Sequence, residues 1–332
     1  MNAMPSPVFE LSDAYIERLA ALDPGYATAL GIPGSDHLMT DFSPAGNEER
    51  QTLTRATLAK LSTLDQSSDS DRLAAGVLRN SLEMAEREFE AGEHLRTIRV
   101  LAGDVDYARS VFDLMPTSTA DQWKTIAERM SRVPEAFNGM RESWRLGMQR
   151  NVVAPLRQVI AVADMLDGWA GTATKPGFFA SLAEQAATVN GAPMDALRSA
   201  AKEASAALSE TAAFLRNTYA PIADPRNGVG EERHALARRR YLGMDIDADD
   251  AYEWGLEEVR RIDAELQKCA KEIKPGATLD EVRSYLDNES PEAIEGEENL
   301  RQWLQNLMDD AMDFLITNDH FDIPEGIRTI EA

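Results

Sequence analysis

An apolar stripe at helical spacing constrains the fold of this chain more than any other feature. It consists of Trp123, Ile126, Met130, Val133, Phe137, Met140, Trp144 and Met148. Steps of three and four residues place all of these side chains on one face of a helix, which predicts a buried helical face. Pro134 lies within the run and cannot donate a backbone N–H, so we expect a break or kink there with the phase of the stripe kept.

Four more stripes have the same spacing and are too long for strands. They occupy residues 78–89, 197–219, 252–273 and 300–314. We expect each to lie in the core, with Cys269 on the third of these as an inert buried thiol. No alternating run demands a sheet, although a short strand could begin in residues 323–330. The pattern predicts an all-α fold, an elongated multi-helix bundle of about ten to thirteen helices with little or no sheet.

Charge and turn residues suggest two parts. The Pro- and Gly-containing stretch at residues 221–230 predicts a boundary between an N-terminal helical domain, 1–222, and an acidic helical segment, 223–332. Residues 245–332 hold 25 acidic and 8 basic residues, which is −17 of the total charge of −23. These acids are interpreted as solvated helix faces, as a face for a basic partner, or as a face for more of the same polypeptide.

Composition excludes several classes of function. No basic block is available to neutralise phosphates, so a nucleic-acid partner is not expected, and the acidic balance argues against an anionic membrane surface. No run approaches the roughly 20 apolar residues that cross a bilayer. The single cysteine rules out an internal disulfide, and residues 1–11 lack the basic and apolar regions of a secretory signal. We therefore expect a cytoplasmic protein.

Metal and catalytic motifs are not recognised in this sequence. The histidines are His37, His94, His234 and His320, and none belongs to a His-Glu-x-x-His motif. The Glu231 and His234 pair has di-iron spacing, but no second such pair exists. Asp245, Asp247 and Asp249 resemble the start of a calcium loop that lacks its glycine and its final glutamate. We therefore assign no catalytic residue and no metal ligand.

Two segments look unlike a plain bundle, residues 102–116 and residues 228–241. The second contains three consecutive arginines, 238–240, which could grip a carboxylate or pair with the acidic last third of the chain. The residues considered for a substrate cleft are Tyr107, Arg109, Arg239, Tyr241 and Trp254. Each of them could equally serve a structural role.

Long stretches of the chain resemble a bacterial family catalogued as domain of unknown function 885. They are "LDPGYATALGI", "TDFSPAGNEER", "GDVDYARSVFDLMPTSTADQW", "RMSRVPEAF" and "GVGEERHALARRRYLGMDIDADDAYEWGLEEVRRIDAEL", in this order between residues 22 and 266. The resemblance implies a mainly helical protein related to gluzincin-like metallopeptidases. It also implies zinc-dependent hydrolysis of peptides in complete members, where zinc polarises the scissile carbonyl and activates water.

Complete members of that family are considerably longer, and their His-Glu zinc helix lies in a C-terminal half that this sequence does not reach. The resemblance therefore implies that zinc is expected only in the full-length protein. We expect this chain to be the N-terminal helical part, to form one wall of a substrate cleft for peptides, and to be inactive alone. Its expected partner is the C-terminal half of the same polypeptide. The alternatives are a non-catalytic all-α binding or scaffold module, and a metal-free enzyme that uses carboxylates and the arginine run.

Overall fold

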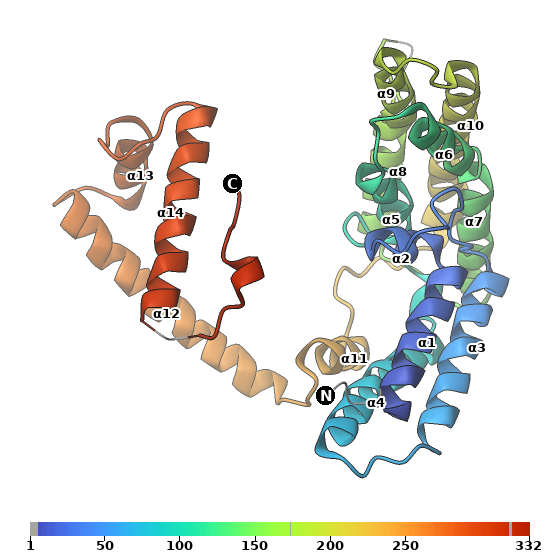
Figure 1. Ribbon diagram of the computed structural model, residues 1–332, viewed down its shortest axis with the longest axis horizontal. Coiled ribbons are helices and arrows are strands. Elements are labelled where there is room, and N and C mark those ends of the chain that lie inside the picture. The colour runs from blue at the N-terminus through green and yellow to red at the C-terminus, as the bar shows by residue number, and fades with distance from the viewer. Residues whose placement is uncertain (1–5, 173, 319–320) are drawn as a thin grey trace. The chain divides into compact units, whose positions relative to one another are not determined.

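The computed structural model describes residues 6–172, 174–318 and 321–332. The chain divides into two compact units, residues 1–245 and 246–332, which are drawn in Figure 1. The boundary expected after residue 222 lies one helix earlier than this division. Helix α11 (Glu231–Leu242) belongs to the first unit because it packs against α4 (Asp69–Glu90).

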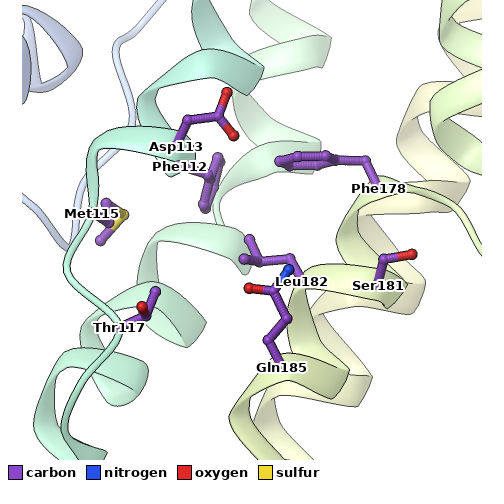
Figure 2. Close-up of a pocket in the computed structure, with 8 residues that line it drawn as sticks. All are labelled: Phe112, Asp113, Met115, Thr117, Phe178, Ser181, Leu182 and Gln185. Atoms are coloured by element: carbon purple, nitrogen blue, oxygen red, sulfur yellow. The ribbon is translucent and has the colours of Figure 1, made fainter. Parts of the chain in front are cut away.

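The first unit is made of helices and short helical turns. Its elements are α1 (Pro7–Leu22), α2 (Pro24–Ala29), α3 (Pro44–Leu61), α4 (Asp69–Glu90), η1 (Glu93–Leu95), α5 (Asp104–Ser110), η2 (Val111–Leu114), α6 (Ala120–Met130), α7 (Val133–Gln149), α8 (Leu156–Ala170), α9 (Phe178–Gln185), η3 (Ala186–Thr188), α10 (Met194–Phe214), the π-helical turn η4 (Leu215–Tyr219), η5 (Ala220–Ile222) and α11 (Glu231–Leu242). Figure 2 shows η2 facing α9 across a small pocket.

The second unit contains α12 (Ala248–Ile273), α13 (Leu279–Asn288), α14 (Glu297–Thr317) and the 3₁₀ turn η6 (Glu325–Ile327). Helix α13 packs against α12. Asp247 caps α12 by accepting from the N–H groups of Asp249 and Asp250, and Thr278 and Glu281 form a capping box at the start of α13. No strand forms in residues 321–332, because the η6 turn interrupts the stretch in which one was expected.

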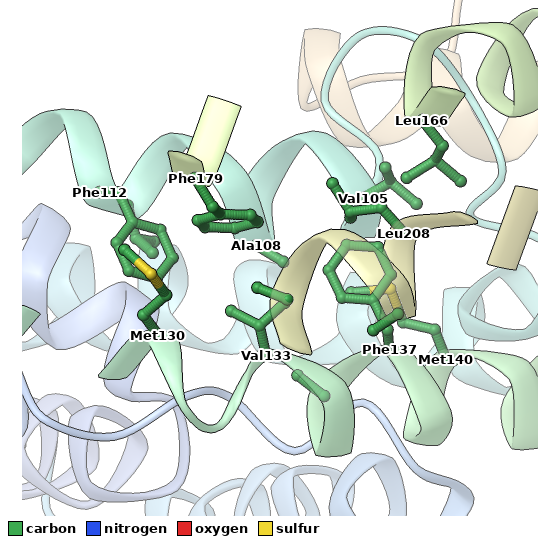
Figure 3. Packing of buried hydrophobic residues seen from close by; sticks show 14 of the residues in the cluster. Val105, Ala108, Phe112, Met130, Val133, Phe137, Met140, Leu166, Phe179 and Leu208 are labelled. Atoms are coloured by element: carbon green, nitrogen blue, oxygen red, sulfur yellow. The ribbon is translucent and has the colours of Figure 1, made fainter. Parts of the chain in front are cut away.

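The predicted stripe of residues 123–148 is confirmed as the centre of the main core. Helix α6 ends at Met130 and α7 begins at Val133 with Pro134 in its first turn, so the break falls where the proline predicts it. The phase is kept across the break, since Trp123, Met130 and Trp144 are all buried. Figure 3 shows this core, where Met130, Val133 and Phe137 meet residues of α5 and α10. The all-α prediction is likewise confirmed among the described residues.

Helix α10 passes through this core and touches α6, α7, α8 and α9. Its predicted stripe is buried from Leu197 to Leu208 and continues to Tyr219 in the π-helical turn. The hydroxyl of Tyr219 accepts a hydrogen bond from the backbone N–H of Ala154 at 2.8 Å, so its polar end is satisfied. Helices α1, α3 and α4 pack on one another around a second, smaller cluster that includes Val8 and Leu61.

The stripes of α12 and α14 form helices as predicted but do not lie in a core. Val259 is 64% exposed and Leu307 is 50% exposed, and no residue of α14 is buried. Cys269, expected to be a buried thiol, is exposed. These helices have too few neighbours in the second unit to cover their apolar faces. None of the described helices is both long and apolar enough to span a membrane.

Candidate functional site

Tyr107 of α5 is held by a partly buried polar contact to Asp23, the residue that caps the start of α2. Its hydroxyl donates to Oδ1 of Asp23 at 3.0 Å, and the hydroxyl of Thr40 donates to the same oxygen at 2.5 Å. A Cβ atom at Gly25 would lie 2.8 Å from the Tyr107 hydroxyl, so the close approach requires glycine. Burial, and then the negative charge of Asp23, raise the pKa of Tyr107. Tyr107 therefore joins two helices and stays protonated.

Asp104 opens the same helix, α5, with a carboxyl group facing the core. Its Oδ2 accepts from the Thr97 hydroxyl at 2.6 Å, and Nε1 of Trp144 donates to that hydroxyl at 3.3 Å. Burial raises the pKa of Asp104 to about 6, although the hydrogen bond from Thr97 acts in the opposite direction. The carboxyl group of Asp104 therefore stays mostly protonated in the folded protein below about pH 6.

Arg109 stands beside the pocket of Figure 2 without lining it. Its NH1 is 2.9 Å from Oδ2 of Asp113, and its guanidinium lies 5.3 Å from the ring centre of Trp169 and 4.9 Å from that of Phe178. The pocket has a volume of about 330 Å³ and is lined by Phe112, Asp113, Met115, Thr117, Phe178, Ser181, Leu182 and Gln185. Arg109 therefore positions two of its lining residues, Asp113 and Phe178.

A larger cavity, the arginine pocket, lies where α11 meets α4 and the segment after η1. It has a volume of about 670 Å³ and is lined by Arg87, Ala91, Arg96, Arg226, Val229, Gly230, Glu231, Glu232, Arg233, Ala235, Leu236, Arg239 and Asp245. Five of these residues are arginines. All of them belong to the first unit.

One carboxylate organises the wall of the arginine pocket. Glu93 of η1 accepts from Nε of Arg233 at 2.8 Å and from NH2 of Arg233 at 2.7 Å, and its Oε1 is 2.9 Å from NH2 of Arg96. Burial alone would raise the pKa of Glu93, but these guanidinium groups outweigh it and hold the pKa below its ordinary value. Glu93 thereby fixes α11 to η1.

The arginine run of α11 pairs with carboxylates of the first unit. Arg240 lies 2.7 Å from Glu88 of α4, Arg239 lies 3.4 Å from Asp245, and Arg238 lies 3.7 Å from Glu231. Of these partners only Asp245 comes from residues 245–332, where most of the negative charge lies. Arg240 therefore attaches α11 to α4, and Arg239 lies on the wall of the pocket.

The five residues predicted to line a cleft do not form one site. Tyr107 contacts Asp23, Arg109 contacts Asp113, and Arg239 lines the arginine pocket. Tyr241 is 82% exposed, and Trp254, which is 65% exposed, belongs to the second unit. The sequence did not single out Arg96 or Arg226, the first in an irregular segment and the second in a turn. Arg233 falls within residues 228–241, which it did single out.

The histidines that the structure describes do not gather into a metal site. No group of three or more His, Cys, Asp or Glu side chains suited to a metal occurs in residues 6–172, 174–318 and 321–332. His94 stacks on Phe89 with ring centres 4.0 Å apart. Burial, followed by the charge of Arg150, lowers the pKa of His94 to about 4. His320 lies outside the described residues. The described side chains therefore do not fit a zinc centre.

Fold and cavity together define a helical protein with an arginine-lined pocket in its first unit. The chain belongs to the family described as bacterial protein of unknown function, DUF885, whose model matches residues 24–332. No curated protein matches it.

Two solved structures share the fold. The "putative lipoprotein" from Colwellia psychrerythraea has a TM-score of 0.69 and 14% identity, and the match covers 95% of this chain and 60% of that one. A "putative lipoprotein of unknown function" from Shewanella oneidensis has a TM-score of 0.64 and 14% identity, covering 97% of this chain and 59% of that one. The chain thus spans about three fifths of the length of these structures.

Proposed function

We propose that these 332 residues are the helical part of a zinc-dependent peptidase-like protein. In this proposal they form one wall of a substrate cleft for peptides, and further polypeptide supplies the metal centre. The peptidase assignment comes from the family resemblance of residues 22–266. The described residues do not fit zinc, so no catalytic step is assigned to them.

The exposed apolar faces of the second unit are the observation that carries the proposal. On α12 they include Tyr252, Val259, Ile262 and Leu266, and on α14 Leu300, Trp303, Leu304 and Leu307. Single exposed apolar side chains are ordinary, but contiguous apolar surfaces mark interfaces. Covering one such Leu or Val side chain completely stabilises an interface by about 1.5–3 kcal/mol. The helices thus have the apolar surface of an interface between parts of a larger protein.

The occupant that we propose for these faces is more of the same polypeptide. The match covers about three fifths of both solved relatives, so each contains a substantial region without a counterpart here. A covalently linked partner also fits the charge of residues 245–332, since a net of −17 disfavours association with a second copy of the same surface.

The zinc content and peptidase activity of two proteins test the proposal. We expect the product of the complete natural reading frame to hold about one zinc ion per chain and to hydrolyse peptides. The 332-residue chain should do neither. The measurement is elemental analysis of dialysed protein together with hydrolysis of a mixed peptide library. Stoichiometric zinc and turnover in the 332-residue chain, or neither in the longer protein, would refute the proposal.

The alternative function is a non-catalytic all-α binding or scaffold module. The exposed faces of α12 and α14 also suit a separate protein partner. A natural reading frame that stops at Ala332 would favour this alternative. Cytoplasmic location stays a prediction: the lone cysteine fits a reducing compartment, whereas the two solved relatives are described as putative lipoproteins.

A further inference from the structure

We infer that the arginine pocket binds a small organic carboxylate with an apolar body, such as the C-terminal end of a short peptide. The pocket lies entirely within the first unit, whereas the proposed function rests on the faces of the second unit. The two proposals can therefore fail separately.

The pocket has spare donors for an anion. Each guanidinium carries five N–H donors in a planar fork that matches a carboxylate. Arg87 lines the pocket, is exposed, and takes part in no ion pair among the described residues. Arg96 is largely buried, and its Nε has no hydrogen-bond partner in the described part of the chain. Because the Nε of Arg96 is itself covered, the spare guanidinium N–H groups that a ligand can reach are those of Arg87.

The carboxylates near the pocket do not cancel this capacity. Glu93 is occupied by Arg233 and Arg96. Asp224 accepts from Nε of Arg226 at 3.1 Å and from its NH2 at 2.9 Å. These bonds hold two acids in place and leave the remaining N–H groups of the exposed Arg226 available.

The start of α11 adds backbone donors to one side of the pocket. Gly230 precedes the helix with φ of 80°, a conformation that favours glycine, and no side chain caps the first turn. Gly230, Glu231 and Glu232 line the pocket, so the uncapped end of this twelve-residue helix borders the same cavity. Backbone N–H groups at a helix start favour anions.

The remaining lining indicates what kind of anion fits. Glu231, Glu232 and Asp245 contribute negative charge at the wall, which disfavours a dianion such as phosphate more than a single carboxylate. Ala91, Val229 and Leu236 provide an apolar part of the wall for a small hydrocarbon body. The volume of about 670 Å³ is in the range of small-molecule sites.

Calorimetric titration of the 332-residue chain tests the inference with three probes: N-acetyl-dialanine, the C-terminal amide of the same peptide, and inorganic phosphate. We expect the acid to bind at least about tenfold more tightly than either the amide or phosphate. No binding of the acid at about 10 mM, equal binding of acid and amide, or tighter binding of phosphate would overturn the inference.

A double variant and a control variant locate the binding. The double variant Arg87→Gln/Arg226→Gln removes two exposed guanidinium groups from the pocket lining and leaves the Arg233–Glu93 contact that attaches α11. We expect at least about tenfold weaker binding of the acid, with an unchanged circular dichroism spectrum. The matched control is Arg132→Gln, an exposed arginine outside the pocket, which should bind like the parent. Equal loss in both variants, or loss in neither, would contradict the assignment to this pocket.

Discussion

Replacing Arg129 with methionine is expected to lower the free energy of unfolding of the first unit by about 3 kcal/mol. Arg129 comes from the last turn of α6 and is fully buried. Its Nε donates to the carbonyl of Leu38 at 2.8 Å, and its NH2 donates to the carbonyl of Ser35 at 3.1 Å and to the hydroxyl of Thr28 at 2.8 Å. Methionine fills similar space but removes all three of these donors, and the carbonyl of Ser35 then keeps only the backbone N–H of Leu38.

The measurement is urea denaturation followed by circular dichroism. Arg132→Met is the matched control because Arg132 is exposed three residues later, and its change should stay within about 0.5 kcal/mol. Asp36 is 3.9 Å from Arg129 and 40% exposed, so most of the expected loss comes from the hydrogen bonds to α2 and to the loop that follows it. Equal stability of the two variants would show that Arg129 does not hold this loop.

Asp104→Asn is expected to stabilise the protein by about 2 kcal/mol above pH 6 and to leave stability nearly unchanged at pH 4. The pKa of Asp104 is about 6 in the folded protein, above its ordinary value of 3.8. As the pH rises from about 4 to 6, Asp104 ionises in the unfolded chain before it ionises in the folded protein. The parent protein therefore loses stability over this pH range. Asparagine cannot ionise and keeps an oxygen that accepts from Thr97.

Urea denaturation of the parent and the Asp104→Asn variant at several pH values between 4 and 7 measures this difference. The expected stability change is smaller than the free energy that corresponds to the full pKa shift, because Asp104 is only partly buried. The parent and the variant share every other titrating group. The diagnostic quantity is therefore how the difference between their free energies of unfolding changes with pH. A constant offset across the range would show that Asp104 is ionised throughout.

The helices were predictable because their apolar periodicity is local. The stripes from Trp123 to Trp144 and from Leu197 to Tyr219 both form helices and both lie in the core. The break before Pro134 was also predictable, because the missing N–H acts within one turn of the chain. Burial of the α12 and α14 stripes was not predictable, because periodicity identifies an apolar face but not the surface that covers it.

The arginine pocket could be predicted only in part. The run at residues 238–240 drew attention to α11, and Arg239 does line the pocket. Glu93 and Arg233 are 140 positions apart, and no local spacing links them. The same holds for Arg129, whose contact to Leu38 spans 91 positions. Arg129 follows the buried Ile126 by three residues, but a charged residue at that position does not by itself predict burial. Long-range polar contacts of this kind can be identified only once the fold is known.

Hydrogen–deuterium exchange tests most directly the central claim that further polypeptide covers α12 and α14. The 332-residue chain is compared with the product of the complete natural reading frame. We expect exchange in residues 248–273 and 297–317 to slow by at least about tenfold in the longer protein, while α6, α7 and α10 exchange equally in both. Equal exchange of α12 and α14 in the two proteins, or a reading frame that ends at Ala332, would contradict the claim.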